Sequence, residues 1–278
     1  MAPSIPVYEV YALKYAERDA RRTDNFVGGD PHDAPMPMDY FIWLIRNDDR
    51  VVLVDTGFDA PMAIKRGRRL LRQPRVALRL IGVAAEDVRT VVITHLHNDH
   101  VGTFFDFPYA IFHLQDKEMK HVTGRHMTHE RLRRPYEPDH VAGVIRMTYE
   151  DRVVFHDGDE DLAPGISVHL IGGHTAGLQA VRVHTARGWV VLASDASHYY
   201  EHFEHGRVFP TTFNIGETLE GYGKLQRLAE SPQHIVPGHD PLVMQRYPAA
   251  SSDLEGIAVR LDRNPRTVNA KEVSNPGR

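Results

Sequence analysis

The sequence of 278 residues contains no cysteine. This absence excludes disulfides, iron–sulfur clusters and thiolate metal ligands, and it leaves the redox compartment open. No apolar run approaches the roughly 20 residues that span a bilayer. Residues 1–7 also lack a basic segment followed by an apolar core. We therefore expect a soluble, cytoplasmic protein that does not bind membranes.

The chain also has no excess of positive charge. Its formal net charge is −4, whereas phosphate-binding proteins need a basic face, so nucleic acid is not an expected partner. The Arg-rich run at residues 65–75 is local, and we interpret it as a solvated helix face. A hydrophobic content of 42% can fill a sizeable core, and no linker divides the sequence. These features predict a single domain over residues 1–278.

The apolar patterns predict alternating strands and helices. Residues 19–37 are expected to form a loop, and residues 121–140 are polar, rich in His and Arg, and suited to a lid over a site. In that segment we expect surface or lid residues rather than metal ligands at His121, His126, His129 and His140. Expected strands are 7–13, 40–46, 51–55, 110–114, 153–156, 166–171, 180–184 and 189–193. Expected helices are 61–71, 76–81, 116–122, 141–149, 218–229 and 251–261.

The most informative stretch is residues 91–102. It begins with β-branched residues typical of a buried strand and continues into His95, His97, Asp99 and His100. Imidazole nitrogens and carboxylate oxygens are ligands that zinc accepts. A turn after the strand can point the first two side chains one way and the last two another, which favours two metal ions. The alternative is an ordinary polar loop in a chain with 18 histidines.

Other candidate ligands also follow apolar strands. His174 lies in the glycine-rich segment 172–177, where glycines allow a tight turn that presents the ring inward. Asp195 follows the strand 189–193, and His239 follows a Pro-Gly pair. Asp55 ends the strand 51–55, where it can either orient a metal ligand or serve as a turn or cap residue. This repeated placement is hard to explain by packing alone.

These residues resemble the metallo-β-lactamase superfamily. The His-x-His-x-Asp-His motif, the later single His, the bridging Asp and the final His are matched by His95, His97, Asp99, His100, His174, Asp195 and His239. The resemblance implies that His95, His97 and His174 hold one divalent ion, that Asp99, His100 and His239 hold the other, and that Asp195 bridges them. Zinc is the expected metal. The implied fold is an α/β (α+β) four-layer αββα sandwich.

Within the superfamily, the sequence is most similar to the N-acyl-homoserine lactonases. This similarity implies a quorum-quenching type of activity on a small lactone or ester, with a monomer or homodimer expected. The sequence departs from the studied lactonases at Asn98, where they have an aromatic residue, and at His198, where they have a tyrosine. These departures fall where substrate would bind, so we expect the substrate preference to shift from acyl-homoserine lactones towards other lactones or esters.

The candidate catalytic residues lie at or next to these two positions in the sequence. Asp99 is a candidate proton carrier, and His198 and Tyr199, with Tyr200 beside them, are candidate donors to the oxyanion. The tyrosines are equally compatible with packing. A thioester hydrolase similar to glyoxalase II, or a phosphodiester hydrolase, is the alternative, but the sequence shows no basic glutathione site or groove. A non-catalytic binding protein would be expected to have lost at least one ligand, and none is replaced.

Overall fold

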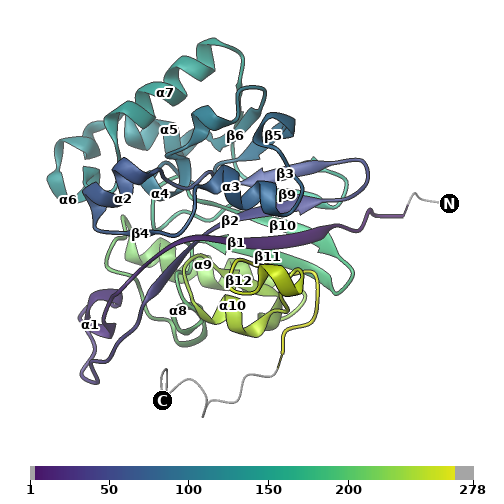
Figure 1. Cartoon of the computed structure of the whole chain (residues 1–278). Helices are drawn as coiled ribbons and strands as arrows, with labels where there is room; N and C mark the ends of the chain where they lie inside the picture. Colours follow the sequence, from purple (N-terminus) through teal and green to yellow (C-terminus); the bar gives the residue numbers. More distant parts are fainter. Residues whose placement is uncertain (1–3, 267–278) are drawn as a thin grey trace.

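Two β-sheets form the centre of the molecule (Figure 1). The computed structural model describes residues 4–266. The strands are β1 Glu9–Arg18, β2 Met38–Arg46, β3 Val51–Val54, β4 Arg69–Leu70, β5 Thr90–Val92, β6 Ile111–Gln115, β7 Val153–His156, β8 Glu160–Ala163, β9 Ile166–Leu170, β10 Gln179–Thr185, β11 Gly188–Ser194, β12 Ile235–Pro237 and β13 Ala258–Arg260. The α-helices are α1 Arg22–Asn25, α2 Ala60–Arg66, α3 Pro74–Leu80, α4 Asn98–Val101, α5 Asp116–Val122, α6 Glu130–Arg133, α7 Pro138–Tyr149, α8 Tyr200–His205, α9 Ile215–Leu228 and α10 Leu242–Arg246.

The first sheet has the order β13-β1-β2-β3-β5-β6-β7, with β4 paired to β1, and the second has the order β12-β11-β10-β9-β8. Strand β1 is buried on both faces because its side chains alternate between two cores. Val10 and Ala12 pack against residues of the second sheet such as Val181, whereas Leu13 packs with Leu78 of α3. The two sheets therefore share a core between them, and the first sheet packs against helices on its other face.

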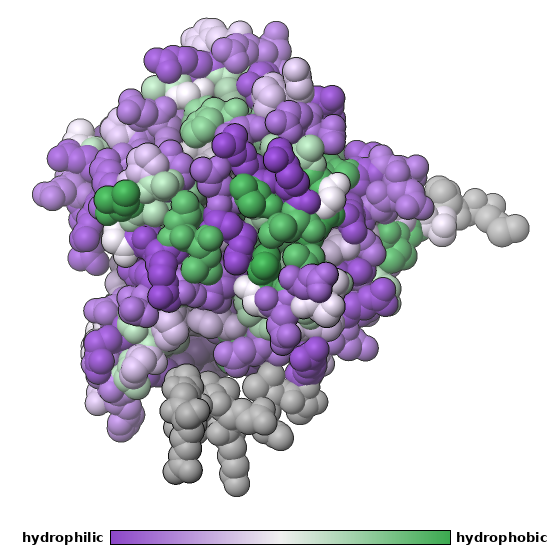
Figure 2. All heavy atoms as spheres, viewed as in Figure 1, coloured by the Kyte–Doolittle hydropathy of each residue, from purple (hydrophilic) through white to green (hydrophobic). Residues whose placement is uncertain are grey.

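Helices cover the outer face of each sheet (Figure 1). Helices α2, α3, α5 and α7 contribute to the core beneath the first sheet, and α8, α9 and α10 pack against the second. The order of layers is helix, sheet, sheet, helix, which confirms the expected αββα sandwich. On the face shown in Figure 2 the surface is largely polar, and exposed apolar side chains gather over α2 and α3, including Ile64, Val76 and Leu80. None of the helices in residues 4–266 is long and apolar enough to cross a membrane.

One expected helix is too long and another is wrong. The helix expected over residues 61–71 ends at Arg66, because Gly67 takes a left-handed conformation and the chain then forms β4. The helix expected over residues 251–261 is instead a short 3-10 turn followed by β13, which pairs with β1. Gly256 has φ +71° and interrupts the helical pattern. The loop expected over residues 19–37 contains the short helix α1.

The ends of strands from both sheets meet at one edge of the sandwich. Strands β3 and β5 run parallel, as do β11 and β12, so their carboxyl ends point the same way within each pair. Asp55 follows β3, the 95–100 segment follows β5, Asp195 follows β11 and His239 follows β12. This topology places side chains that are far apart in sequence around a common point.

Candidate metal centre

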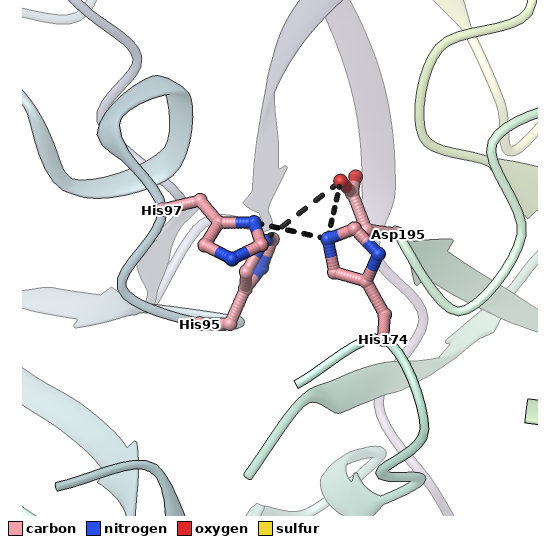
Figure 3. Close-up of side chains that lie close together, drawn as sticks. All are labelled: His95, His97, His174 and Asp195. Atoms are coloured by element: carbon pink, nitrogen blue, oxygen red, sulfur yellow. Dashed lines mark hydrogen bonds and ion pairs between the residues drawn. The ribbon is translucent and has the colours of Figure 1, made fainter. Parts of the chain in front are cut away.

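Four of the expected ligands converge on one point (Figure 3). Nitrogen or oxygen atoms of His95, His97, His174 and Asp195 all lie within 4.8 Å of one another. Nδ1 of His97 faces Nε2 of His174 at 3.0 Å, and the latter nitrogen lies 3.2 Å from Oδ2 of Asp195. Nε2 of His95 lies 3.8 Å from the same carboxylate oxygen. The three rings thus direct nitrogens at one side of Asp195.

A second group lies on the other oxygen of the same carboxylate. Oδ1 of Asp195 is 2.9 Å from Nε2 of His239 and 3.3 Å from Nε2 of His100. Asp99 completes this group, with its Oδ1 3.9 Å from Nε2 of His100. The structure therefore brings together all seven residues that the sequence identified as ligands, and Asp195 presents one oxygen to each group.

The orientation of the rings suits metal binding. Nδ1 of His100 bonds to Oδ2 of Asp55 at 2.7 Å, and Nδ1 of His239 donates to the backbone carbonyl of Asp39 at 2.8 Å. In both rings this directs Nε2 at the centre, the nitrogen that must carry no proton when it binds a metal ion. Nε2 of His95, Nε2 of His100 and Oδ1 of Asp195 are buried and have no hydrogen-bond partner among the described residues. Divalent cations would satisfy these atoms, so the residues present fit two metal ions.

Asp55 anchors the segment that carries the ligands. Its carboxylate accepts hydrogen bonds from the backbone nitrogen of Thr94 at 2.7 Å and from the Thr94 hydroxyl at 2.8 Å. That hydroxyl also contacts the Ser194 hydroxyl at 2.9 Å, which must be the donor because the Thr94 proton is already engaged. Asp55 and Ser194 both have positive φ, 61° and 47°. These bonds hold two backbone segments in uncommon conformations beside the centre.

The electrostatics also match a cation site. Burial, together with neighbouring imidazoles, lowers the pKa of His95 and of His97 well below the usual value, so both rings are neutral. Burial alone would raise the pKa of Asp195, but His198 and His239 hold it well below its usual range. Burial disfavours the charged form of His100, yet Asp195 and the other nearby carboxylates raise its pKa well above normal. The carboxylates therefore give the centre a negative charge, which a bound divalent cation would neutralise.

Glu118 is a site residue that the sequence reasoning missed. Its buried carboxylate accepts hydrogen bonds from the backbone nitrogen of Leu96 at 3.0 Å, from the Thr175 hydroxyl at 2.6 Å and from the backbone nitrogen of Gly177 at 3.0 Å. It therefore joins the loop of His95 and His97 to the loop of His174. Within its own helix Glu118 looks like an ordinary surface acid, so no local pattern could have identified it.

The three donor candidates after Asp195 lie in different places. Nε2 of His198 is 3.1 Å from Oδ2 of Asp195, and its ring stacks on Phe209 with centroids 3.7 Å apart. Tyr199 points away, because its hydroxyl bonds to the backbone carbonyl of Pro37 at 3.1 Å and its ring is buried in the core. Tyr200 is also buried in the core. Of the three, only His198 lines the cavity that opens onto the centre.

A cavity of about 990 Å³ opens onto the centre. Its wall includes His97, Asp99, His174, Asp195, His198 and His239. The 121–140 segment contributes His121, Glu130, Arg131, Leu132, Arg134, Pro135 and Tyr136. Movement of this segment as a lid stays a prediction. Asn98 also lines the cavity, and its side-chain amide donates to the carbonyl of Pro135 at 2.8 Å, which ties the ligand loop to that segment.

The cavity is more basic than the sequence indicated. Lys65, Arg66 and Arg68, interpreted above as part of a solvated helix face, all line it. Lys65 and Arg66 both form ion pairs with Glu137. Arg18, at the end of β1, joins them from another part of the chain. Sequence spacing could not reveal this grouping, because it depends on the pairing of β4 with β1.

Comparisons with known proteins agree with this geometry. The chain is 29% identical over 228 residues to "Probable metallo-hydrolase Rv2300c" of Mycobacterium tuberculosis, covering 72% of this chain and 71% of that protein. It is 28% identical over 225 residues to the N-acyl homoserine lactonase AiiB of Agrobacterium fabrum, covering 71% and 78%.

Solved structures show the same fold. A quorum-quenching N-acyl homoserine lactone lactonase superposes with a TM-score of 0.72 at 20% identity, covering 86% of this chain and 95% of that one. The dizinc quorum-quenching lactonase AidC superposes with a TM-score of 0.65 at 17% identity, covering 86% and 90%. The model of the metallo-beta-lactamase superfamily matches residues 37–263. The chain belongs to the metallo-β-lactamase superfamily.

Proposed function

We propose that this protein is a dinuclear metal-dependent hydrolase that opens a lactone or cleaves a carboxylic ester, with zinc as the expected metal. The observation that carries this proposal is the position of Asp195, whose two oxygens face two separate groups of ligands. The similarity to named N-acyl homoserine lactonases supports the lactone class. A cytoplasmic location and a monomeric or homodimeric state stay predictions.

Two divalent ions held by these residues would lower the pKa of a water and polarise the substrate carbonyl. Side chains of the protein would orient the substrate and transfer the protons. Asp99 lines the cavity with a partly exposed carboxylate, so it can accept the proton of the attacking water. His198 is kept neutral because burial lowers its pKa well below normal. In the Nε2-protonated form it can donate a hydrogen bond to the developing oxyanion, and its stacking on Phe209 fixes the ring. Asp99 can then carry the proton that it accepted to the leaving oxygen.

A thioester or phosphodiester hydrolase on the same centre is the second candidate. The basic residues of the cavity wall favour it, since thiol carriers and phosphodiesters are commonly anionic.

A substrate panel tests the proposal. Protein reconstituted with zinc would be assayed with γ-lactones, aryl esters, thioesters and phosphodiesters, beside an Asp195→Asn variant that lacks the shared carboxylate. We expect lactones or esters to give the highest kcat/KM, with activity lost in the variant. Higher kcat/KM for thioesters or phosphodiesters would overturn the assignment, as would equal rates for the variant.

A further inference from the structure

Two arginines stand side by side on the cavity wall without a carboxylate. Strand β4 pairs antiparallel with β1, with Ala16 opposite Leu70 and Glu17 opposite Arg69. Arg18 and Arg68 directly follow and precede the members of the last pair, so they are neighbours at the end of this short ladder. Both line the cavity and both are half-buried. Like charges that lie close together are unfavourable, so this placement needs an explanation.

The cations closest to Arg68 in the sequence are neutralised, but Arg18 and Arg68 are not. Arg69 forms an ion pair with Glu17, and Lys65 pairs with Glu137. Among residues 4–266, no carboxylate lies within ion-pair distance of Arg18 or Arg68. The side-chain hydrogen bonds of Arg18 and Arg68 are limited to one with the sulfur of Met38 and one with the carbonyl of Arg66. Most of their N–H donors therefore remain available for a ligand.

The arginine pair also lies close to the metal centre. The guanidinium of Arg68 lies 5.6 Å from the ring centre of Tyr40. The same ring contacts His239, with ring centres 4.9 Å apart, and His239 faces Asp195 at 2.9 Å. Tyr40 therefore contacts both Arg68 and a residue of the candidate centre. A small molecule whose reactive carbonyl lies at the centre can reach them with a substituent a few bonds away.

We propose that Arg18 and Arg68 bind an anionic group, a carboxylate or a phosphate, on the part of the substrate that does not react. Two guanidinium groups offer paired donors that match either anion. The substrate class is thus a lactone or ester that carries negative charge. This inference rests on the proposed hydrolase function and restricts its substrate, because a neutral acyl tail would leave the arginine pair unsatisfied.

The test uses matched substrates. A γ-lactone bearing a ring carboxylate would be compared with its carboxamide, which has nearly the same shape without the charge, and with a lactone bearing a phosphate monoester. Zinc-loaded wild type, Arg18→Gln, Arg68→Gln and Arg69→Gln would be assayed. Arg69 is the matched control because it is exposed, is not among the cavity-lining residues and has its own partner in Glu17.

We expect the wild type to prefer an anionic lactone over the carboxamide by about tenfold or more in kcat/KM, as expected for a charged hydrogen bond. Each cavity variant should reduce that ratio by a similar factor, mainly through KM, while Arg69→Gln keeps it. The better of the carboxylate and phosphate lactones identifies the anion. Absence of a preference in the wild type, or an equal loss for charged and neutral lactones in the variants, would overturn the inference.

Calorimetric titration of the same lactones into the same proteins separates this inference from the proposed function. If no lactone is hydrolysed, the proposed function fails, but tighter binding of the anionic lactone that depends on Arg18 and Arg68 would still support the anion site. If the lactones are hydrolysed and bind equally well with and without charge, only the anion site fails.

Discussion

Oδ2 of Asp55 accepts a hydrogen bond from Nδ1 of His100 at 2.7 Å, although the two residues follow different strands. The bond fixes the ring so that Nε2 faces Asp195. Asp55 is buried, and burial raises its pKa while His100 opposes that shift. The structure thus favours the orienting role for Asp55 over a role as a simple turn residue.

Asp55→Asn should weaken metal binding by about 10- to 100-fold, as loss of an orienting partner usually does. The amide can still occupy the space, but it is a weaker acceptor for the His100 proton. Competition with a metal chelator measures the affinity. Asp49→Asn, the same change in an exposed turn, is the control and should bind metal as the wild type does. Equal affinity in Asp55→Asn would argue against the orienting role.

The wild type should contain two metal ions per chain, because seven ligand side chains exceed what one four- or five-coordinate ion needs. Asp195→Asn should lose metal as well as turnover, since the change removes a charged oxygen from both groups at once. Elemental analysis after gentle dialysis gives both stoichiometries, with exposed Asp161→Asn as control. Full activity with one ion per wild-type chain would contradict the dinuclear assignment, and so would a variant that keeps two ions.

Gly177→Ala should destabilise the protein by about 1–3 kcal/mol, the usual cost of overpacking, and should also weaken metal binding. A Cβ at this position would overlap the backbone nitrogen and Cα of Glu118, which cannot move without releasing the His174 loop. Urea unfolding gives the stability change. Gly216→Ala is the control, because the nearest atom to its added Cβ is Asn214 Oδ1 at 3.4 Å. Equal stability of the two variants would show that Glu118 tolerates the shift.

His202 should make stability fall as the pH is lowered. Burial lowers its pKa from 6.5 to about 4, and its Nε2 bonds to the carbonyl of Asn25 at 3.0 Å. The unfolded chain therefore binds a proton more readily, so the stability from the neutral ring is complete above pH 6.5 and is lost as the pH falls towards 4. The loss is about 3 kcal/mol.

Urea unfolding at a series of pH values checks this dependence. The stability difference between wild type and His202→Gln should narrow as the pH falls from 7 to 4. His205→Gln, on an exposed position of the same helix, should show a difference from wild type that hardly changes with pH. A constant difference for His202→Gln would remove His202 as the source of the effect.

A longer acyl chain on the substrate should not raise kcat/KM. Asn98 places an amide rather than an apolar side chain at the cavity, and this amide already donates to the Pro135 carbonyl. Measured kcat/KM should stay flat or fall along a series of acyl-homoserine lactones of increasing length, and simple γ-lactones should compare well with them. A steep rise with chain length would show that aromatic residues such as Phe209 and Phe213, which also line the cavity, supply the apolar groove.

Several features of this protein could be predicted from the sequence because their signals are local. The alternation over residues 7–13 predicted the first strand, and the 95–100 motif places four candidate ligands on one turn. Glycines beside His174 indicate the tight turn there, and both Gly172 and Gly173 have positive φ. The αββα layers could be predicted mainly through the family resemblance that these motifs carry.

Tertiary structure decided what depends on contacts between distant segments. Residues 251–261 carry an apolar pattern compatible with a helix, but hydrogen bonding to β1 makes residues 258–260 a strand. The carbonyl of Asp39 orients His239, although the two residues are 200 positions apart in the sequence. The pairing of β4 with β1, which brings Arg68 near Arg18, is not indicated by the sequence of either segment. The sequence by itself therefore determined which side chains can hold metal. The packing of strands decided which groups orient those side chains and which charges face the substrate, because both depend on the register between strands rather than on local periodicity.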